Sequence, residues 1–458
     1  CNLDAHPNKQ KFSKWIRNKK ISVKDLFPKL KESEFYKIDL SVGSEWIGGR
    51  NEIEDLNLFQ FKIDKLQKKY PKKIIAGGYL EPRAIYTSDT YEKTGNYGAE
   101  NRTIHLGLDF WLPPETKVSA MFDGEVVTAV NDEGDKEYGG LVILKHNIED
   151  LEFYTLYGHN TVESVLKNKI GSKVDKGDVI AEIANYPENG NWAPHLHFQI
   201  MLSMLDYRID YPGVCYFNQI DVWKDLCPDP NLIFKSKDLD LDLSDSEDEL
   251  IKYRNSHLGK SLKLHYEEPL HIVRGEGVYL MDNYGRKYLD TVNNVAHVGH
   301  ENESVVAKGK SQMSILNTNS RYLHKNINEL SKELLKTLPN KLSVVHFVNS
   351  GSEANELAIR MMKSHTGQGD IIVSEHGYHG NTNICVDISS YKFDGKGGNG
   401  PPENTHVIPI PNNFRGKYRG SGSAKKYLNE VETCIKNIHS KKRGLGGFII
   451  EPILSCGG

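Results

Sequence analysis

The chain has few cysteines, no long apolar run and almost no charge excess in its 458 residues. Its six cysteines are irregularly spaced and form no CxxC pair, so a disulfide framework is not indicated and we expect a reducing, cytoplasmic location. No apolar segment reaches the length of a membrane span. A formal net charge of −3 gives no electrostatic reason to expect nucleic acid or an anionic membrane as a partner.

The sequence also lacks an internal repeat and a visible signal peptide. It begins at Cys1 rather than Met, so we expect that residues precede it; a mature lipoprotein, which also begins at cysteine, is the alternative. The length exceeds one ordinary core and predicts two or three domains. A content of 38% hydrophobic and 26% charged residues is typical of a soluble globular protein.

The pattern of apolar residues changes along the chain and predicts four parts. Residues 1–75 have the spacing of short amphipathic helices. Residues 76–234 carry runs of period two, such as GLVILKHN and HLHFQIM, which predict an antiparallel sheet. Residues 235–252 are acidic and low in complexity, as in a linker. In residues 253–458 strand-like and helix-like segments alternate, which predicts an α/β domain with a mainly parallel sheet.

Three short motifs in the β-rich part supply histidines and an aspartate. IHLGLDFW contains His105 and Asp109, PHLHF contains His195 and His197, and LYGH contains His159. On a strand, residues two apart face the same side, so both histidines of HLHF are expected to enter one site. Imidazole and carboxylate are zinc ligands, and three of them with an open position make a catalytic site. Each histidine taken alone is more often a surface or satisfied core residue.

The order of these motifs resembles peptidase family M23, the lysostaphin-like zinc endopeptidases, over roughly residues 75–205. The resemblance implies that His105, Asp109 and His197 bind Zn²⁺ and that His159 and His195 are catalytic. It implies a peptide or peptidoglycan-like substrate. The alternative is that this part survives as a non-catalytic binding or structural module.

A second constellation begins where HFVNSGSEANELAIRMMK predicts a strand, a turn and a helix. The turn Ser350-Gly351-Ser352 then lies at a helix N-terminus, where free N–H groups and the helix dipole favour a phosphate. Alone, such a turn is more often a simple N-cap. Further on, EHGYHGNT places Tyr378 and His379 after a strand, where an aromatic ring can stack on a flat cofactor or pack in the core.

These segments, together with GVYLMDNYGRKYLD and EPILSCGG, resemble a class III aminotransferase over residues 253–458, and most of all its phospho-lyase branch. The resemblance implies pyridoxal 5′-phosphate (PLP) as cofactor, with its phosphate on Gly351 and Ser352, helped by Ser350. Tyr378 would stack on the pyridine ring beside His379, and Glu451 would lie near the ring edge. Residues 293–300 would line the substrate entrance.

Two departures from that family qualify the resemblance. The family's Asp that pairs with the pyridine nitrogen and its Schiff-base lysine have no counterpart in the chain, and PLP chemistry needs both. We therefore expect a truncated domain that neither transaminates nor eliminates by itself. Cys456 stands where many class III transaminases carry a second Glu, which favours the lyase branch.

The sequence thus predicts a multidomain protein with a mainly antiparallel β domain and a truncated α/β domain of PLP fold type I. The leading hypothesis is a PLP-dependent aminotransferase or phospho-lyase fused to a zinc metalloendopeptidase. It implies a small amino or phospho-amino substrate and a homodimer formed through the PLP domain. The alternatives are that only the PLP part is catalytic, or that the chain is a non-catalytic scaffold.

Overall fold

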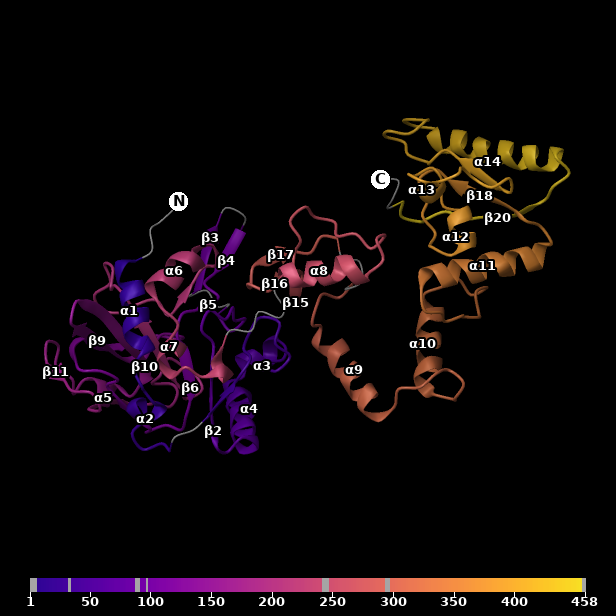
Figure 1. The fold of residues 1–458 in the computed structure, drawn as a ribbon. Helices are drawn as coiled ribbons and strands as arrows, with labels where there is room; N and C mark the ends of the chain where they lie inside the picture. The colour runs from indigo at the N-terminus through magenta and orange to yellow at the C-terminus, as the bar shows by residue number, and fades with distance from the viewer. Residues whose placement is uncertain are drawn as a thin grey trace. The chain divides into compact units, whose positions relative to one another are not determined.

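The computed structural model of the chain describes residues 6–31, 34–86, 91–95, 98–240, 247–292 and 297–454. It divides into two compact units, Cys1–Asn317 and Thr318–Gly458 (Figure 1). Cys456 and the first four residues of the predicted entrance segment lie outside the described residues. Among the helices that are described, none combines the length and the apolar composition that crossing a membrane requires.

The first unit is built on an eight-stranded sheet. In sheet order its strands are β1 (Glu34–Lys37), β2 (Lys73–Gly77), β6 (Leu108–Trp111), β13 (Leu196–Met201), β10 (Leu151–Asn160), β9 (Gly139–Ile148), β8 (Gly124–Asp132) and β11 (Lys173–Val174). In this sheet β1 and β2 pair in parallel, and every other neighbouring pair of described strands is antiparallel. The predicted mainly antiparallel β domain is confirmed.

Smaller sheets surround the large one. They are β12 (Val179–Glu182) with β7 (Lys117–Ser119), β14 (Val214–Cys215) with β5 (Ile104–His105), β3 (Glu92–Gly95) with β4 (Gly98–Asn101), and the meander β15 (Ile272–Glu276), β16 (Tyr279–Asp282) and β17 (Lys287–Leu289). The hairpin predicted from VYLMDNYGRKYLD is therefore present as β16 and β17.

Strand alternation gives the large sheet two different faces. Leu108 and Phe110 of β6 belong to the main buried cluster, as do the even-numbered residues Leu196, Phe198 and Ile200 of β13. Because side chains alternate, the residues between them must point to the opposite face. That opposite face of β6 and β13 carries polar side chains, and it is where the candidate site lies.

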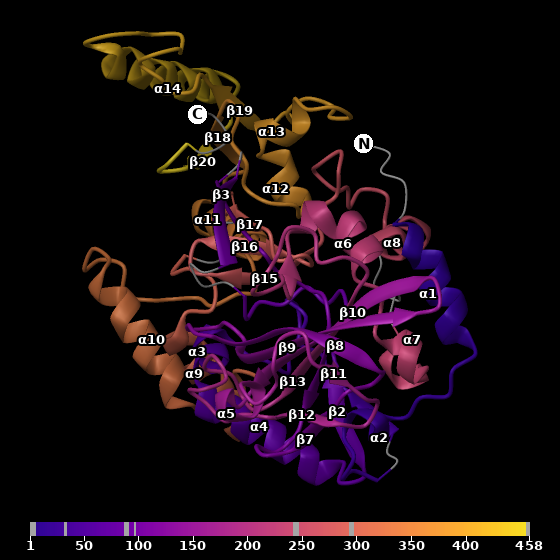
Figure 2. The same cartoon turned by 90° about the vertical axis from the view of Figure 1, so that its left-hand side faces the viewer.

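The first unit also contains helices, several of which lie around the sheet and its connections (Figure 2). They are α1 (Pro7–Arg17), α2 (Val23–Leu26), α3 (Arg50–Glu54), α4 (Leu56–Lys69), α5 (Val162–Val165), α6 (Ile220–Leu226), α7 (Asn231–Phe234), α8 (Glu247–His257) and α9 (Glu303–Ile315), with 3-10 turns at Phe217–Gln219 and Lys237–Leu239. In the described part of the segment predicted as helical, residues 1–75, there are four helices, β1 and the first three residues of β2. Apolar spacing did not reveal β1, because it has four residues and only Phe35 is fully buried.

The acidic segment 235–252 includes the 3-10 turn at Lys237–Leu239 and the start of α8, while residues 241–246 are outside the description. The first unit continues past this segment to Asn317. The boundaries at residues 75, 234 and 252 stay predictions.

One arginine joins the β15–β17 meander to the body of the first unit. Its guanidinium donates to the carbonyl oxygens of Val42 at 2.8 Å, Gly48 at 2.9 Å and Ser44 at 3.4 Å, and pairs with Glu301 at 2.9 Å. This residue is Arg274, whose side chain is only 9% exposed. It therefore ties the meander to the loop before α3.

The second unit is an α/β layer around three parallel strands, β19 (Thr405–Ile408), β18 (Asp370–Ser374) and β20 (Leu445–Phe448). Ile371 and Val373 of β18 pack against α11 (Gly351–Thr366) and α12 (Asn383–Asp387). Ile372, between them, packs against α14 (Ser423–Ser440) on the other face (Figure 1). The predicted parallel α/β domain is confirmed.

Two further helices and one segment without regular structure complete this unit. The helices are α10 (Lys325–Lys336) and α13 (Ser390–Phe393). The segment VVHFVN, predicted as a strand, has no strand assignment and joins no sheet among the described residues.

We expect Arg274→Ala to lower the free energy of unfolding of the first unit by about 2–4 kcal/mol, since a charged hydrogen bond contributes about 1.5–3 kcal/mol. Glu301 would lose its charged partner and keep the Arg50 N–H as a donor. All five tryptophans lie in this unit, so tryptophan fluorescence during denaturant unfolding reports on it alone. Lys252→Ala, which removes an exposed i,i+3 ion pair, is the control and should change stability by less than about 0.5 kcal/mol. Equal effects of the two variants would contradict this role of Arg274.

Candidate metal site and phosphate cradle

The site in the first unit begins with a row of four residues across neighbouring strands. Asp109 of β6 lies directly opposite His197 of β13. On the outer sides, Gly77 of β2 lies opposite Asp109, and Gly158 of β10 lies opposite His197. A Cβ at Gly158 would come within 2.4 Å of the Tyr138 ring, so this position needs glycine. The sheet therefore presents one carboxylate and one imidazole side by side, with small residues flanking them.

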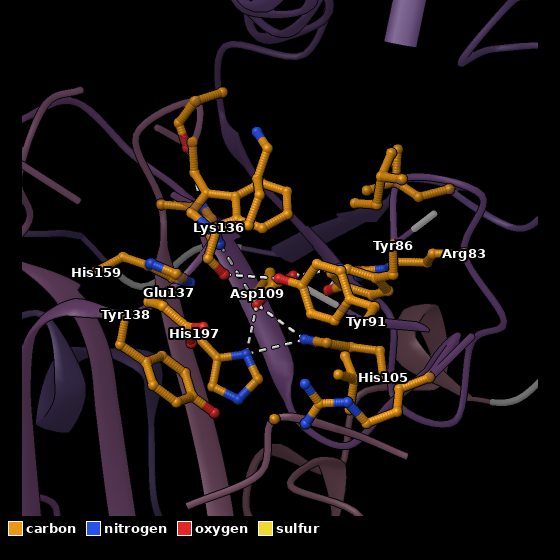
Figure 3. A pocket seen from close by; sticks show the side chains of 18 of the residues that line it. Arg83, Tyr86, Tyr91, His105, Asp109, Lys136, Glu137, Tyr138, His159 and His197 are labelled. Atoms are coloured by element: carbon orange, nitrogen blue, oxygen red, sulfur yellow. Dashed lines mark hydrogen bonds and ion pairs between the residues drawn. The ribbon is translucent and has the colours of Figure 1, made fainter. Parts of the chain in front are cut away.

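His105 completes a set of three donors. Its Nε2 lies 2.9 Å from Nδ1 of His197 and 3.3 Å from Oδ1 of Asp109, and His197 Nδ1 lies 3.1 Å from the same oxygen (Figure 3). All three side chains are at most 4% exposed. Among the described residues these are the one group of three whose donor atoms lie close enough to hold a metal ion.

In His105 and His197, the hydrogen bond of the ring nitrogen that points away from the site shows whether the nitrogen that faces the site carries a proton or a lone pair. His105 Nδ1 lies 2.9 Å from the carbonyl oxygen of Gly78, and His197 Nε2 lies 3.0 Å from Oε1 of Gln199. Each of these oxygens accepts a hydrogen bond, so the ring nitrogen opposite it must carry an N–H. The Gln199 atom that faces His197 is the oxygen, because the amide nitrogen donates to the Pro212 carbonyl and to Cys227 Sγ. The other two ring nitrogens, His105 Nε2 and His197 Nδ1, then carry lone pairs. These lone pairs and Oδ1 of Asp109 are directed at one point.

This donor set fits zinc. For metal–ligand distances of about 2.0–2.1 Å, ligands at the corners of a tetrahedron lie about 3.3 Å apart, close to the distances between these three donors. Two lone pairs and a carboxylate oxygen facing one another need a cation between them. His105, Asp109 and His197 are therefore the residues of this chain that would hold Zn²⁺.

His195 and His159 lie beside the three donors. His195 comes one residue before β13, with its Nδ1 2.7 Å from the Ala193 carbonyl and its Nε2 3.8 Å from Asp109 Oδ1. His159 lies near the end of β10, where the register shifts and its backbone has a φ of 66°. Such an irregularity re-aims a side chain, and here it brings the His159 ring to 4.4 Å from that of His195.

Burial and neighbouring charges set the protonation states. Burial, with the Arg83 charge second, lowers the pKa of His105 to about 3. Burial also lowers the pKa of His195, and it lowers that of His159 well below its usual range. Burial raises the pKa of Asp109, but His105 and Arg83 outweigh it and hold the pKa well below the usual range. At neutral pH these three histidines are then neutral and Asp109 is ionised; a neutral imidazole and an ionised carboxylate are the forms that bind a metal.

A cavity of about 360 Å³ opens onto these five residues. Its wall contains both aromatic and charged side chains. The side chains that line it include Tyr86, Tyr91, Trp111, Tyr138, Trp192, Arg102, Lys136 and Glu137. Figure 3 shows His105 and His197 turned toward Asp109, with Tyr86 and Tyr91 beside them. The site can therefore accept a ligand several atoms long next to the donors.

In the second unit the Ser350-Gly351-Ser352 turn begins α11, as the sequence predicts. Ser350 is the N-cap, and its Oγ accepts from the Glu353 N–H at 3.1 Å. The Oγ of Ser352 accepts from the N–H of Asn381 at 3.1 Å, which joins the turn to the YHGNT loop. The turn thus has its expected place at a helix N-terminus, and its two serines already have hydrogen-bond partners within the protein.

Tyr378, His379 and Glu451 also come together in this unit. The Tyr378 N–H donates to Glu451 Oε1 at 2.9 Å, and Asn355 links α11 to the His379 carbonyl at 2.8 Å. Burial lowers the pKa of His379, and its Nε2 is buried with no hydrogen-bond partner among the described residues. A Cβ at Gly377 would lie 3.0 Å from this nitrogen, and the loop that carries His379 contacts Ser352 at the start of α11. A buried polar atom without a partner in such a loop fits a bound polar cofactor such as PLP.

Several residues of the metal site were not found from the sequence. Gln199 follows His197 by two residues on the same strand face, and this spacing was a usable indication. Gly78 and Arg83 lie between the β2 strand and the first histidine motif, where neither periodicity nor a motif marks them. Their roles follow from contacts between separate segments.

The comparisons with known proteins agree with both constellations. The family model of peptidase family M23 matches residues 103–207, and that of aminotransferase class-III matches residues 263–458. The chain carries a domain of each family. The first match contains the five residues that the sequence predicts for the metal site, and the second contains the six residues predicted to bind PLP.

Several curated relatives and solved structures are similar to this chain over slightly less than half of its length. The alanine–glyoxylate aminotransferase 2-like protein of Drosophila melanogaster is 41% identical over 219 residues, covering 46% of this chain and 44% of the relative. The ethanolamine-phosphate phospho-lyase homolog 1 of Caenorhabditis elegans is 34% identical over 225 residues, covering 46% and 48%. A solved phospholyase from Arthrobacter in complex with phosphoethanolamine is 33% identical over 45% of this chain and 48% of that chain, with a TM-score of 0.41. The chain spans about half the length of the curated relatives it matches.

We expect the purified chain to bind one equivalent of Zn²⁺, measured by metal analysis after dialysis and by competition with a chelator. His197→Ala removes a donor and should weaken zinc binding by more than about 100-fold, beyond the 10–100-fold typical of outer-shell changes. His159→Ala should retain the metal, since its ring is not one of the three donors.

The control is His257→Ala, on the exposed face of α8. Zinc binding unaffected by His197→Ala, or lost equally in His159→Ala, would contradict the assignment of the donors.

Proposed function

We propose that the M23 domain is a zinc-dependent endopeptidase. The observation that carries this proposal is the set of three buried donors with two further, non-ligand histidines on its cavity side. When bound in such a site, zinc supplies Lewis-acid polarisation of a carbonyl and a nucleophile from water near neutral pH.

The protein's own residues have separate roles in this proposal. His105, Asp109 and His197 hold the metal. His195 and His159, uncharged at neutral pH, each direct Nδ1 at a backbone carbonyl, so Nε2 carries a lone pair that accepts a proton as general base. Once protonated, the same nitrogen can donate to a developing oxyanion. The cavity wall excludes water from a peptide segment bound along it. A peptide or peptidoglycan-like polymer is the substrate class we propose.

We also propose that the class III domain binds PLP and acts on a small amino or phospho-amino substrate. Gly351 and Ser352 would hold the phosphate at the start of α11, Tyr378 would stack on the ring, and His379 and Glu451 would lie beside it. When bound, PLP supplies an electron sink for chemistry at a carbon next to an amine. One relative is named for an aminotransferase and another for a phospho-lyase, so both reactions remain within this proposal.

Assembly and location complete the proposal. We propose a homodimer through the class III domain, supported by the apolar residues Ile327, Leu330 and Leu334 that α10 exposes. A reducing, cytoplasmic location is supported by the four described cysteines, all of which are free.

Peptide cleavage tests the zinc proposal. The zinc-loaded chain, incubated with glycine-rich and cross-link-like peptides and analysed by mass spectrometry, should release defined fragments, and a chelator should stop the reaction. His159→Ala should keep the metal but slow cleavage by about 10²–10⁴-fold, the usual contribution of a general acid or base. A wild-type chain that holds zinc and cleaves none of these peptides would favour the binding module instead.

Cofactor affinity tests the PLP proposal in the complete protein product that contains this chain. Titration followed by cofactor absorbance should show tighter binding of PLP than of pyridoxal, which lacks the phosphate. Ser352→Ala should reduce this preference, and Tyr378→Ala should weaken both ligands, because it removes stacking rather than phosphate contacts. Ser440→Ala, at the far end of α14, is the control. Equal affinity for PLP and pyridoxal in the wild type would exclude the phosphate cradle.

A further inference from the structure

Arg83 contacts the metal site from outside the segment that matches the M23 family. The match begins at residue 103, whereas Arg83 lies between β2 and β3. Its side chain is 1% exposed, which is rare for arginine. Its Nη1 lies 2.6 Å from Oδ2 of Asp109. A fully buried guanidinium is thus bound to a carboxylate whose other oxygen belongs to the zinc donor set.

The guanidinium itself is held on three sides. Its Nε donates to Oε2 of Glu81 at 2.7 Å, Nη1 also donates to the Tyr86 hydroxyl at 3.1 Å, and Nη2 donates to the Gly77 carbonyl at 3.4 Å. Glu81 is fixed in turn, because its other oxygen accepts from the Leu40 N–H at 3.0 Å. These contacts therefore hold the planar guanidinium of Arg83 in one orientation.

Gly78 shows how closely this arginine is packed. Its φ is 108°, a backbone conformation that favours glycine, and a Cβ there would lie 1.8 Å from Nη2 of Arg83 and 3.0 Å from Nδ1 of His105. The same residue's carbonyl oxygen accepts from His105. One glycine thus gives room to the arginine and orients a proposed metal ligand.

The contact with Arg83 restricts how Asp109 can bind a metal. A carboxylate can bind a metal through one oxygen or two. With Oδ2 taken by Arg83, only Oδ1 faces the two histidines, at 3.1 and 3.3 Å. The Arg83 charge helps to keep Asp109 ionised, and Glu81 partly offsets that charge. Beyond its charge, Arg83 sets the orientation of the ligand through its contact with Oδ2.

Arg83 also lies next to Trp111, whose ring packs on that of His195. Its guanidinium carbon lies 6.0 Å from the centres of both the Tyr86 and the Trp111 rings. Trp111 stacks on the His195 ring at 5.6 Å with 24° between the planes. The same side chain therefore supports a metal ligand directly and a proposed catalytic histidine through one aromatic ring.

We propose that Arg83 is the positioning residue that holds Asp109 as a one-oxygen metal ligand and keeps the fourth metal position open for substrate. This inference rests on the zinc function proposed above. A structural role alone explains the contacts less well, since desolvation largely offsets the attraction within a buried ion pair. Lysine keeps the positive charge of Arg83 but not its planar set of N–H donors, so Arg83→Lys tests whether the planar geometry positions Asp109.

The test compares Arg83→Lys with Arg274→Lys in the full chain. Both arginines are buried and bind a carboxylate and a backbone carbonyl in the same unit, but Arg274 does not touch the donors. We expect Arg83→Lys to raise the zinc dissociation constant by about 10–100-fold, the range for outer-shell partners. We expect Arg274→Lys to leave it unchanged. The absorption spectrum of the Co²⁺-substituted protein should change in Arg83→Lys alone, because it reports ligand geometry.

The outcomes separate the two proposals. Zinc affinity and Co²⁺ spectrum unchanged in folded Arg83→Lys, with zinc bound by the wild type, would overturn the role of Arg83 and leave the zinc function standing. A wild type that binds no zinc would overturn both. If Arg83→Lys fails to fold, the double variant Glu81→Gln with Arg83→Gln removes both charges together. It should weaken zinc by at least about 10-fold, and an unchanged affinity would again overturn the inference.

Discussion

The pairing of Asp109 with His197 across β6 and β13 is the contact on which the first unit's chemistry depends. Two antiparallel strands put directly opposed side chains about 4.5–5.5 Å apart at Cβ. The same alternation sends their neighbours Leu108, Phe110 and Phe198 into the main core. Burying those apolar neighbours therefore fixes the register of both donors, since a slip of one residue would turn them into the core. The stability of the sheet and the geometry of the site have one cause.

This constraint explains why much of the site was predictable. His105, Asp109 and His197 were expected as ligands because the order of their motifs resembles peptidase family M23, whereas strand periodicity placed only His195 and His197 on one face. The prediction that His195 and His197 share a strand was not accurate in detail, because β13 begins at Leu196. His195 reaches the site by following the turn before the strand, and His159 does so through a backbone irregularity. Neither conformation has a period that a sequence reveals.

What the sequence did not predict are the contacts between distant segments. Arg83 and Glu81 lie in a short connection without regular structure, and their meaning comes from Leu40 and Asp109 on other strands or loops. β1 was missed for a related reason, because four residues are too few for a periodic pattern. The segment around Phe347 shows the opposite error, because it has strand-like composition but pairs with no strand among the described residues. Composition alone does not supply the hydrogen-bonding partner that a strand requires.

The two candidate sites differ in what holds them. Every donor of the metal site is buried and tied to a carbonyl or side chain that is itself fixed, so its geometry precedes the metal. Ser350 and Gly351 are exposed and belong to a turn at the start of a helix, where the backbone N–H groups, not a rigid sheet, offer the binding contacts. Preorganisation lowers the ordering cost of binding, and it also restricts which ligand fits. A site built like the first selects an ion by distances of a few tenths of an ångström. A site built like the second selects by charge and shape, and it relies on several such contacts acting together to hold a cofactor.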